Sequence, residues 1–201
     1  KICDENNILL IFDEIVTGFR VALGGAQEYY KVIPDICVTG KAMGSGFPIS
    51  AIMGKEEIMN ILNDDKVVHL GTFNANPLCI TASNITINHL KKGALGYIHK
   101  QGDKLIKGIN DSIQDLRIEA IIQGHESVFQ LFFTKLDQIE SCRELNKVNH
   151  KKYEEFSGEL RNRGVWTYPK ATGHWFISEA HDDETIDETI NIIYQALKRI
   201  K

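Results

Sequence analysis

The sequence predicts an α/β fold followed by an α+β unit, and three observations lead to this prediction. Short apolar runs of strand length alternate with glycine-containing loops and helical stretches up to residue 92. Beyond residue 93, amphipathic helices predominate and alternate with a few short strands. The composition, 43% hydrophobic and 25% charged, is typical of globular proteins. We therefore expect two domains, residues 1–92 and 93–201.

The first strand is predicted at residues 8–12, a continuous apolar run typical of a parallel strand buried on both faces. Asp13 and Glu14 follow it directly. A second strand is predicted at residues 35–39, shortly before Lys41. Open α/β sheets place their ligands at the carboxyl ends of the strands. We therefore expect the charged residues after both strands to face one crevice.

Three further elements complete the first domain. Residues 49–53 form a third apolar stretch, and residues 55–62 have the apolar spacing of a short helix. Residues 75–92 are rich in isoleucine and alanine, which predicts a longer helix. We expect Gly93 and Gly96 to end that helix, because glycine is a common helix terminator.

The second domain has helices marked by apolar residues three and four apart. They are predicted over residues 105–116, over residues 145–160 up to Gly164, and after Asp182, whose carboxylate caps the last helix. Strands are predicted at residues 128–134, 165–168 and 175–178 from their β-branched and aromatic content.

The charge and the apolar runs exclude several classes of protein. A net charge of −4 argues against binding nucleic acid, which needs a basic face. The apolar runs are far shorter than the roughly 20 residues that cross a bilayer. The four cysteines are widely spaced, which predicts reduced thiols in a cytoplasmic protein. The histidines lack metal-ligand spacing.

Asp13 and Lys41 are the two residues to which this pattern assigns chemistry. A lysine in an apolar crevice is driven toward the neutral amine that Schiff-base formation requires. A nearby carboxylate can pair with that lysine or with the protonated ring nitrogen of a bound cofactor. Pyridoxal 5'-phosphate needs both a lysine and an acid partner. The spacing alone also fits an ordinary strand-end aspartate and a surface lysine.

Six motifs follow one another in a fixed order. They are IFDEIVTGFR at 11–20, GGAQEYY at 24–30, PD at 34–35, TGK at 39–41, GSGFP at 44–48 and GTFNANP at 71–77. In order and spacing they resemble the class III pyridoxal-phosphate aminotransferases, and most of all the glutamate-1-semialdehyde aminomutase branch. The resemblance continues weakly through residues 178–190, so it covers nearly the whole chain.

The resemblance implies a fold-type I pyridoxal-phosphate-dependent transferase. Residues 1–92 then correspond to the second part of the cofactor-binding large domain, and residues 93–201 to the small C-terminal domain. It also implies a homodimer. Because the chain begins with Lys1 and the resemblance starts partway through the family's pattern, we expect it to be the later part of a longer polypeptide.

Site residues follow from the resemblance position by position. Lys41 corresponds to the lysine that forms the aldimine and moves the substrate proton, and Asp13 to the carboxylate that keeps the ring nitrogen protonated. Ile15 corresponds to the residue packed on one ring face, which ordinary core packing would also explain. Thr72 corresponds to the hydroxyl that reaches the phosphate of the partner's cofactor.

Two positions depart from the family pattern. Val16 stands where many members carry a glutamine that contacts the cofactor. Gly173 stands where the aminomutase branch keeps a substrate-facing carboxylate. We therefore expect amino transfer from a small amino donor to a carbonyl acceptor, with His174 and Trp175 as possible pocket residues or core. The alternatives are an aminomutase and a non-catalytic remnant of such an enzyme.

Overall fold

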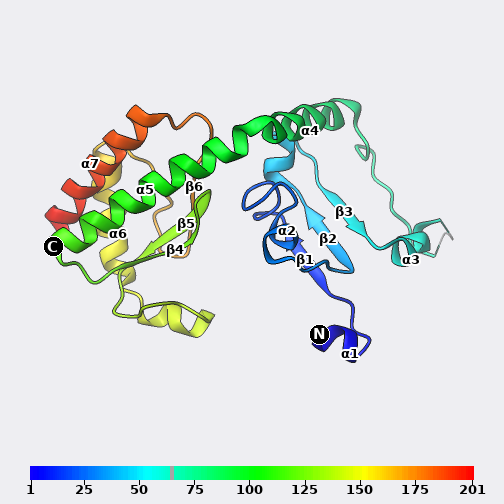
Figure 1. The fold of residues 1–201 in the computed structure, drawn as a ribbon, viewed down its shortest axis with the longest axis horizontal. Helices are drawn as coiled ribbons and strands as arrows, with labels where there is room; N and C mark the ends of the chain where they lie inside the picture. Colours follow the sequence, from blue (N-terminus) through cyan, green and yellow to red (C-terminus); the bar gives the residue numbers. More distant parts are fainter. Residues whose placement is uncertain (64–65) are drawn as a thin grey trace. The chain divides into compact units, whose positions relative to one another are not determined.

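The computed structural model describes residues 1–63 and 66–201, and the chain divides into two compact units (Figure 1). The first unit comprises Lys1–Leu95 and the second Gly96–Lys201. The boundary predicted between residues 92 and 93 lies close to this division. Among the described residues, no helix is both long and apolar enough to cross a membrane.

The first unit is built on a three-stranded sheet of order β1-β2-β3 (Figure 1). The strands are β1 (Ile11–Glu14), β2 (Ile36–Thr39) and β3 (Ala51–Gly54). β1 and β2 are parallel, whereas β3 is antiparallel to β2. The three predicted strands are confirmed, although β1 begins later than expected and includes both carboxylates after the apolar run.

The two faces of this sheet differ in burial. On one face, Glu14 and its partner Thr39 are buried, and so is Cys37, two residues before Thr39 in β2. On the opposite face, Ile11 and Ile52 are 58% and 55% exposed. The prediction that the first apolar run is buried on both faces is therefore wrong, because one face of the sheet has no cover in the described chain.

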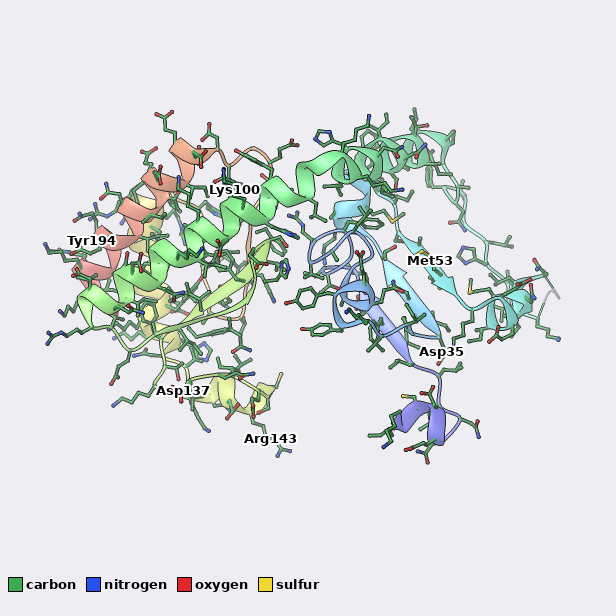
Figure 2. The ribbon with its side chains drawn as sticks, in the orientation of Figure 1. Asp35, Met53, Lys100, Asp137, Arg143 and Tyr194 are labelled. Carbon is green, nitrogen blue, oxygen red and sulfur yellow. The ribbon has the colours of Figure 1, made fainter. Side chains whose placement is uncertain are left out.

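Asp35, labelled in Figure 2, joins the starts of β1 and β2 to the end of β3. Its carboxylate accepts the backbone N–H of Leu10 at 2.7 Å and contacts Lys55 Nζ at 2.6 Å. The hydrogen bond from Lys55, followed by that from Leu10, lowers the pKa of Asp35. These two contacts fix the amino-terminal ends of β1 and β2, whereas the candidate site lies at their carboxyl ends.

Along the chain, short helical segments precede, separate and follow the three strands. They are α1 (Ile2–Glu5), α2 (Ala26–Tyr30), the 3-10 turn η1 (Lys41–Gly44), α3 (Glu56–Met59) and η2 (Asn60–Leu62). The longer α4 (Pro77–His89) begins with proline at its first position. The side chain of Asn76 caps it by accepting the backbone N–H groups of Leu78 and Cys79 at 3.0 and 3.3 Å.

The helix that begins with α4 breaks at Gly93, and Gly96 lies inside the helix that follows. A π-helical turn, η3 (Leu90–Ala94), connects α4 to α5 (Leu95–Leu116), and Gly93 within it has φ 118°. Glycine adopts this left-handed conformation without the steric cost of a Cβ. The prediction that Gly93 ends the helix is confirmed, because its backbone is not helical and divides two helices, whereas Gly96 lies inside α5 and ends no helix.

The second unit combines an antiparallel sheet with three long helices. The sheet has the order β4-β5-β6, with β4 (Ile121–His125), β5 (Val128–Phe132) and β6 (Trp175–Phe176). The helices are α5, α6 (His150–Asn162) and α7 (Asp183–Ile200), and the 3-10 segment η4 (Cys142–Lys147) precedes α6. The prediction missed β4, and the strand expected at residues 165–168 is absent.

The core of the second unit collects apolar side chains from every major element. Fully buried members include Ile109, Leu131, Phe156 and Ile193 from α5, β5, α6 and α7. The predicted cap of α7 is confirmed, since Asp182 accepts the backbone N–H of Thr185 at 2.9 Å. This unit therefore has the buried apolar core that a stable domain requires.

Candidate functional site

The candidate site lies at the carboxyl ends of β1 and β2. In the parallel register, Asp13 lies opposite Val38 and Glu14 opposite Thr39. Lys41 follows the end of β2 after a single intervening residue. The parallel pairing therefore brings the backbone segments of Asp13 and Lys41 to one edge of the sheet.

Asp13 lies on the face of the sheet opposite to Glu14, because neighbouring residues in a strand alternate between faces. Its side chain is exposed, and its Oδ1 accepts the backbone N–H of Ile15 at 3.0 Å. That hydrogen bond holds the carboxylate at the end of the strand through one of its two oxygens. Ile15 itself is half-buried.

Lys41 is the first residue of η1 and its side chain is exposed. Its backbone lies in the left-handed region, with φ 43°. A residue with a Cβ adopts this region at a cost of about 1–2 kcal/mol, so the surrounding structure must hold it there. Met43 contributes, because its N–H donates to Gly40 at 3.1 Å and its sulfur accepts from Thr39 Oγ1 at 3.3 Å.

The glycines after Lys41 have different roles. A Cβ on Gly44 would lie 2.6 Å from Cγ2 of Ile49, so close packing excludes a side chain there. Gly46 has φ 98°, and a Cβ there would meet nothing within 4 Å. Glycine is therefore favoured at this position by its left-handed backbone and not by a lack of space. Both glycines thus shape the loop that follows the candidate lysine.

Thr72 lies in the turn that precedes Asn76 and α4. Its side chain is exposed. The exposed hydroxyl is compatible with a contact to another molecule, and the assignment of Thr72 to a partner's cofactor stays a prediction.

Glu14 is buried on the other face of the sheet from Asp13. It is 1% exposed and accepts the backbone N–H groups of Ala26 and Gln27 at 2.8 Å each, together with the hydroxyl of Thr17. A Cβ on Gly25 would overlap this carboxylate. The Gly-Gly pair before a short helix was the sequence signal for this contact. Glu14 holds the loop that leads from β1 into α2.

The residues at the β1–β2 edge fit one end of pyridoxal 5'-phosphate by their chemistry. The exposed primary amine of Lys41 can bond to the aldehyde of the cofactor. The carboxylate of Asp13, held by one backbone hydrogen bond, can pair with the ring nitrogen. Metal chemistry has no such support, because no cluster of potential ligands occurs among the residues that the structure describes.

The second unit contains a cavity of about 380 Å³ lined by His174 and Trp175, among other residues. Trp166, Tyr168 and Phe176 are exposed aromatic residues along the same cavity. Trp175 itself is 6% exposed, so it belongs to the core as well as to the cavity wall.

Gly173 lies next to Tyr168 in this region. A Cβ on Gly173 would lie 2.3 Å from Cδ1 of Tyr168. Any side chain at position 173, a carboxylate included, therefore requires Tyr168 to move.

Comparison with known proteins identifies clear relatives. The family described as aminotransferase class-III matches residues 1–197. A glutamate-1-semialdehyde 2,1-aminomutase from Methanothrix thermoacetophila is 39% identical over 199 residues, which are 98% of this chain and 46% of the relative. The enzyme of the same name from Methanothermobacter thermautotrophicus is also 39% identical, over 98% of this chain and 47% of the relative.

Solved structures share the fold. An omega-transaminase from Sphaerobacter thermophilus superposes with a TM-score of 0.86 at 23% identity, over 99% of this chain and 46% of that chain. A β-phenylalanine aminotransferase from Variovorax paradoxus superposes with a TM-score of 0.86 at 22% identity, over 96% of this chain and 45% of that chain. The chain thus spans about half the length of the relatives that it matches.

Proposed function

The chain belongs to the class-III aminotransferase family, and from this premise we propose that it provides the lysine and the acid partner of a pyridoxal 5'-phosphate-dependent enzyme. Its fold is the α/β, fold-type I arrangement that the sequence predicts. The observation that carries the proposal is the parallel pairing of β1 and β2, by which Asp13 and Lys41 share one edge of the sheet.

Pyridoxal 5'-phosphate, when bound, supplies an aldehyde that attaches to amines and a ring that accepts electrons. In this proposal Lys41 Nζ holds the cofactor covalently and afterwards takes the proton from the substrate carbon that bears the amino group. Asp13 stabilises a proton on the ring nitrogen through its carboxylate. Ile15 packs on one face of the ring. In a homodimer, Thr72 reaches the phosphate of the cofactor that the second copy binds.

The first candidate reaction moves an amino group within one molecule, as in a glutamate-1-semialdehyde aminomutase. Support comes from the curated relatives, which are 39% identical and carry that name. An aminomutase needs no external amino acceptor, because its substrate receives the amino group that it gives.

The second candidate is transfer between a separate amino donor and a carbonyl acceptor. Gly173 favours it, because Tyr168 fills the space that a carboxylate at this position would need. The two reactions are distinguished by supplying the amino donor alone and then with a set of carbonyl acceptors. Dependence of product formation on the acceptor supports transfer, and product formation from one substrate supports the aminomutase.

Attachment of the cofactor is tested with Lys41→Ala. The expected result is loss of the absorbance of the covalent adduct, and loss of the adduct mass after borohydride reduction. Lys31→Ala is a matched control, because Lys31 is also exposed and also has a left-handed backbone, with φ 56°. An adduct that survives Lys41→Ala excludes the assignment. A 22.7 kDa chain that takes up no cofactor under any condition supports the non-catalytic remnant instead.

A further inference from the structure

A second cavity of the second unit, of about 660 Å³, shares no lining residue with the aromatic cavity next to Gly173. Three segments form most of its wall: the turn after α5, the chain that follows β5, and the junction of η4 with α6. They contribute residues from 117–119, 133–136 and 147–152. The volume lies within the range of small-molecule sites, about 300–1,000 Å³.

The charged side chains of this wall are mostly basic, and we call the hollow the basic cavity. Within the described chain, Glu119 is the one acidic side chain on the wall, whereas the basic ones are Arg117, Lys135, Lys147, Lys152 and Lys201. The excess is local, because the whole chain has a net charge of −4. Like charges gathered around one hollow repel one another, so the cavity attracts an anion.

Carboxylates of the chain neutralise only part of this charge. Lys135 Nζ lies 3.4 Å from Glu119, and Lys147 Nζ lies 3.4 Å from Glu144. The lysines of both pairs are largely exposed, so each pair contributes little.

Two cations of the wall are left for a ligand. Arg117 and Lys152 form no ion pair with any residue that the structure describes. Lys152 is half-buried, and its Nζ lies 5.5 Å from the centre of the Phe133 ring, which belongs to the same wall. This contact holds the ammonium group over the wall of the cavity and leaves its N–H donors without a carboxylate.

Hydrogen bonds fix the three segments of the wall against one another. The N–H of Thr134 donates to the carbonyl of Glu119 at 3.1 Å, and the N–H of Asn149 donates to the carbonyl of Phe133 at 2.8 Å. The hydroxyl of Thr134 donates to the carbonyl of Lys147 at 3.4 Å. A wall tied in this way is preorganised, so a ligand does not have to order it.

Arg117 has a backbone conformation that usually belongs to glycine. It follows the last residue of α5 and has φ 52°. The N–H of Ile118 donates to the carbonyl of Ile113 at 3.0 Å, which is the hydrogen bond of a helix end closed by a left-handed residue. Glycine is the common residue at that position. An arginine there has a conformational cost that its position on the wall of the basic cavity explains.

We infer that the basic cavity binds a small multivalent anion with phosphate or carboxylate groups. Arginine and lysine are the side chains that bind such groups, and arginine does so through two parallel hydrogen bonds. The start of α6 adds the positive end of its dipole, and its first turn contains no acid. The inference is independent of the proposed cofactor site, because Asp13 and Lys41 belong to the first unit.

The test is isothermal titration calorimetry of the chain with pyrophosphate and, separately, with citrate, at constant ionic strength and without pyridoxal 5'-phosphate. We expect one anion per chain, with an affinity that falls as sodium chloride is raised. The double variant Arg117→Gly/Lys152→Gln should weaken binding at least about tenfold, because it removes the two cations without a carboxylate partner. Lys151→Gln is the matched control: Lys151 is exposed, adjoins Lys152 in α6 and does not line the cavity. It should leave the affinity within about twofold.

Arg117→Gly alone separates binding from folding. Glycine adopts the left-handed backbone without strain, so this variant should keep or raise the urea midpoint while it weakens binding. Binding of either anion at the cavity supports the inference, and the tighter of the two identifies the preferred group. If neither anion binds at millimolar concentration, the inference is wrong. Undiminished binding by the double variant, or an equal loss in Lys151→Gln, also overturns it.

Discussion

The carboxylate of Glu14 accepts the backbone N–H of Gln27 at 2.8 Å, so a buried acid from the end of β1 holds the start of α2. The adjacent Asp13 lies on the opposite face of the strand and is exposed. Two neighbouring carboxylates of similar chemistry therefore have separate roles, one in the fold and one at the candidate site.

Glu14→Gln should loosen the loop before α2. The amide can accept one of the two backbone hydrogen bonds and presents an N–H group to the other donor, which costs about 1–3 kcal/mol. Hydrogen exchange should be faster at Ala26 and Gln27 than in the unaltered chain. Glu57→Gln, at an exposed position of α3, is the control and should leave both amides unchanged. Unaltered exchange in Glu14→Gln would contradict the cap.

Glycine-to-alanine substitutions at positions 173 and 158 should have opposite effects. Gly173→Ala places a Cβ 2.3 Å from Cδ1 of Tyr168, and the overlap should destabilise the second unit by about 1–3 kcal/mol. Gly158 lies inside α6, and a Cβ there would meet nothing within 4 Å, so Gly158→Ala should stabilise by up to about 1 kcal/mol. Urea denaturation measures the free energy of unfolding of both variants. Changes of the same sign in the two variants would contradict the contact with Tyr168.

His125 should make the stability of the second unit depend on pH. Burial, and to a lesser degree the neighbouring His99, lower its pKa, whereas Glu126 opposes this shift. The unfolded chain then binds a proton more readily than the folded chain. Stability should be full above the unfolded pKa of about 6.5 and should fall as the pH drops through the lower folded pKa.

The measurement is the urea midpoint of the chain between about pH 7 and pH 5, followed by tryptophan fluorescence. His125→Asn should reduce the loss of stability on acidification. His69→Asn, at an exposed position of the first unit, serves as control and should retain the slope of the unaltered chain. An identical pH profile for His125→Asn and the unaltered chain would exclude His125 as its source.

Tyr153→Phe should destabilise the core of the second unit. Tyr153 is fully buried, and its hydroxyl accepts Nε1–H of Trp175 at 2.9 Å and donates to the carbonyl of Tyr168 at 3.3 Å. Its removal leaves a buried indole N–H unpaired, at a cost of about 1–3 kcal/mol. Tyr194→Phe removes an exposed hydroxyl that donates to Asp115 and should cost well under that. Comparable losses in the two variants would argue against the buried pair.

The positions of the strands, and the placement of Asp13 and Lys41 at the carboxyl ends of two of them, were predictable because they depend on the order of residues along the chain. Short apolar runs ending in charged residues predicted the strands and the shared edge of Asp13 and Lys41, and β1 and β2 are indeed parallel neighbours. The family and the fold-type I class are confirmed. The expectation of amino transfer is supported only at the level of the family, and the curated relatives favour the aminomutase alternative.

Other features depend on contacts that sequence spacing does not encode. β4 contains a glycine and ends in a histidine, and its pairing with β5 decides its conformation. Residues 165–168 have strand-like composition but no strand partner, and Trp166 is 75% exposed. The role of Glu14 depends on a turn that brings residue 27 back to residue 14. Each error therefore depends on whether a tertiary partner is present or absent, which outweighs local preference.

The uncovered side of the β1–β3 sheet has a consequence inside a cell. A polypeptide of these 201 residues, made by itself, would present Ile11 and Ile52 on an outward sheet surface and should be a substrate for chaperones and proteases.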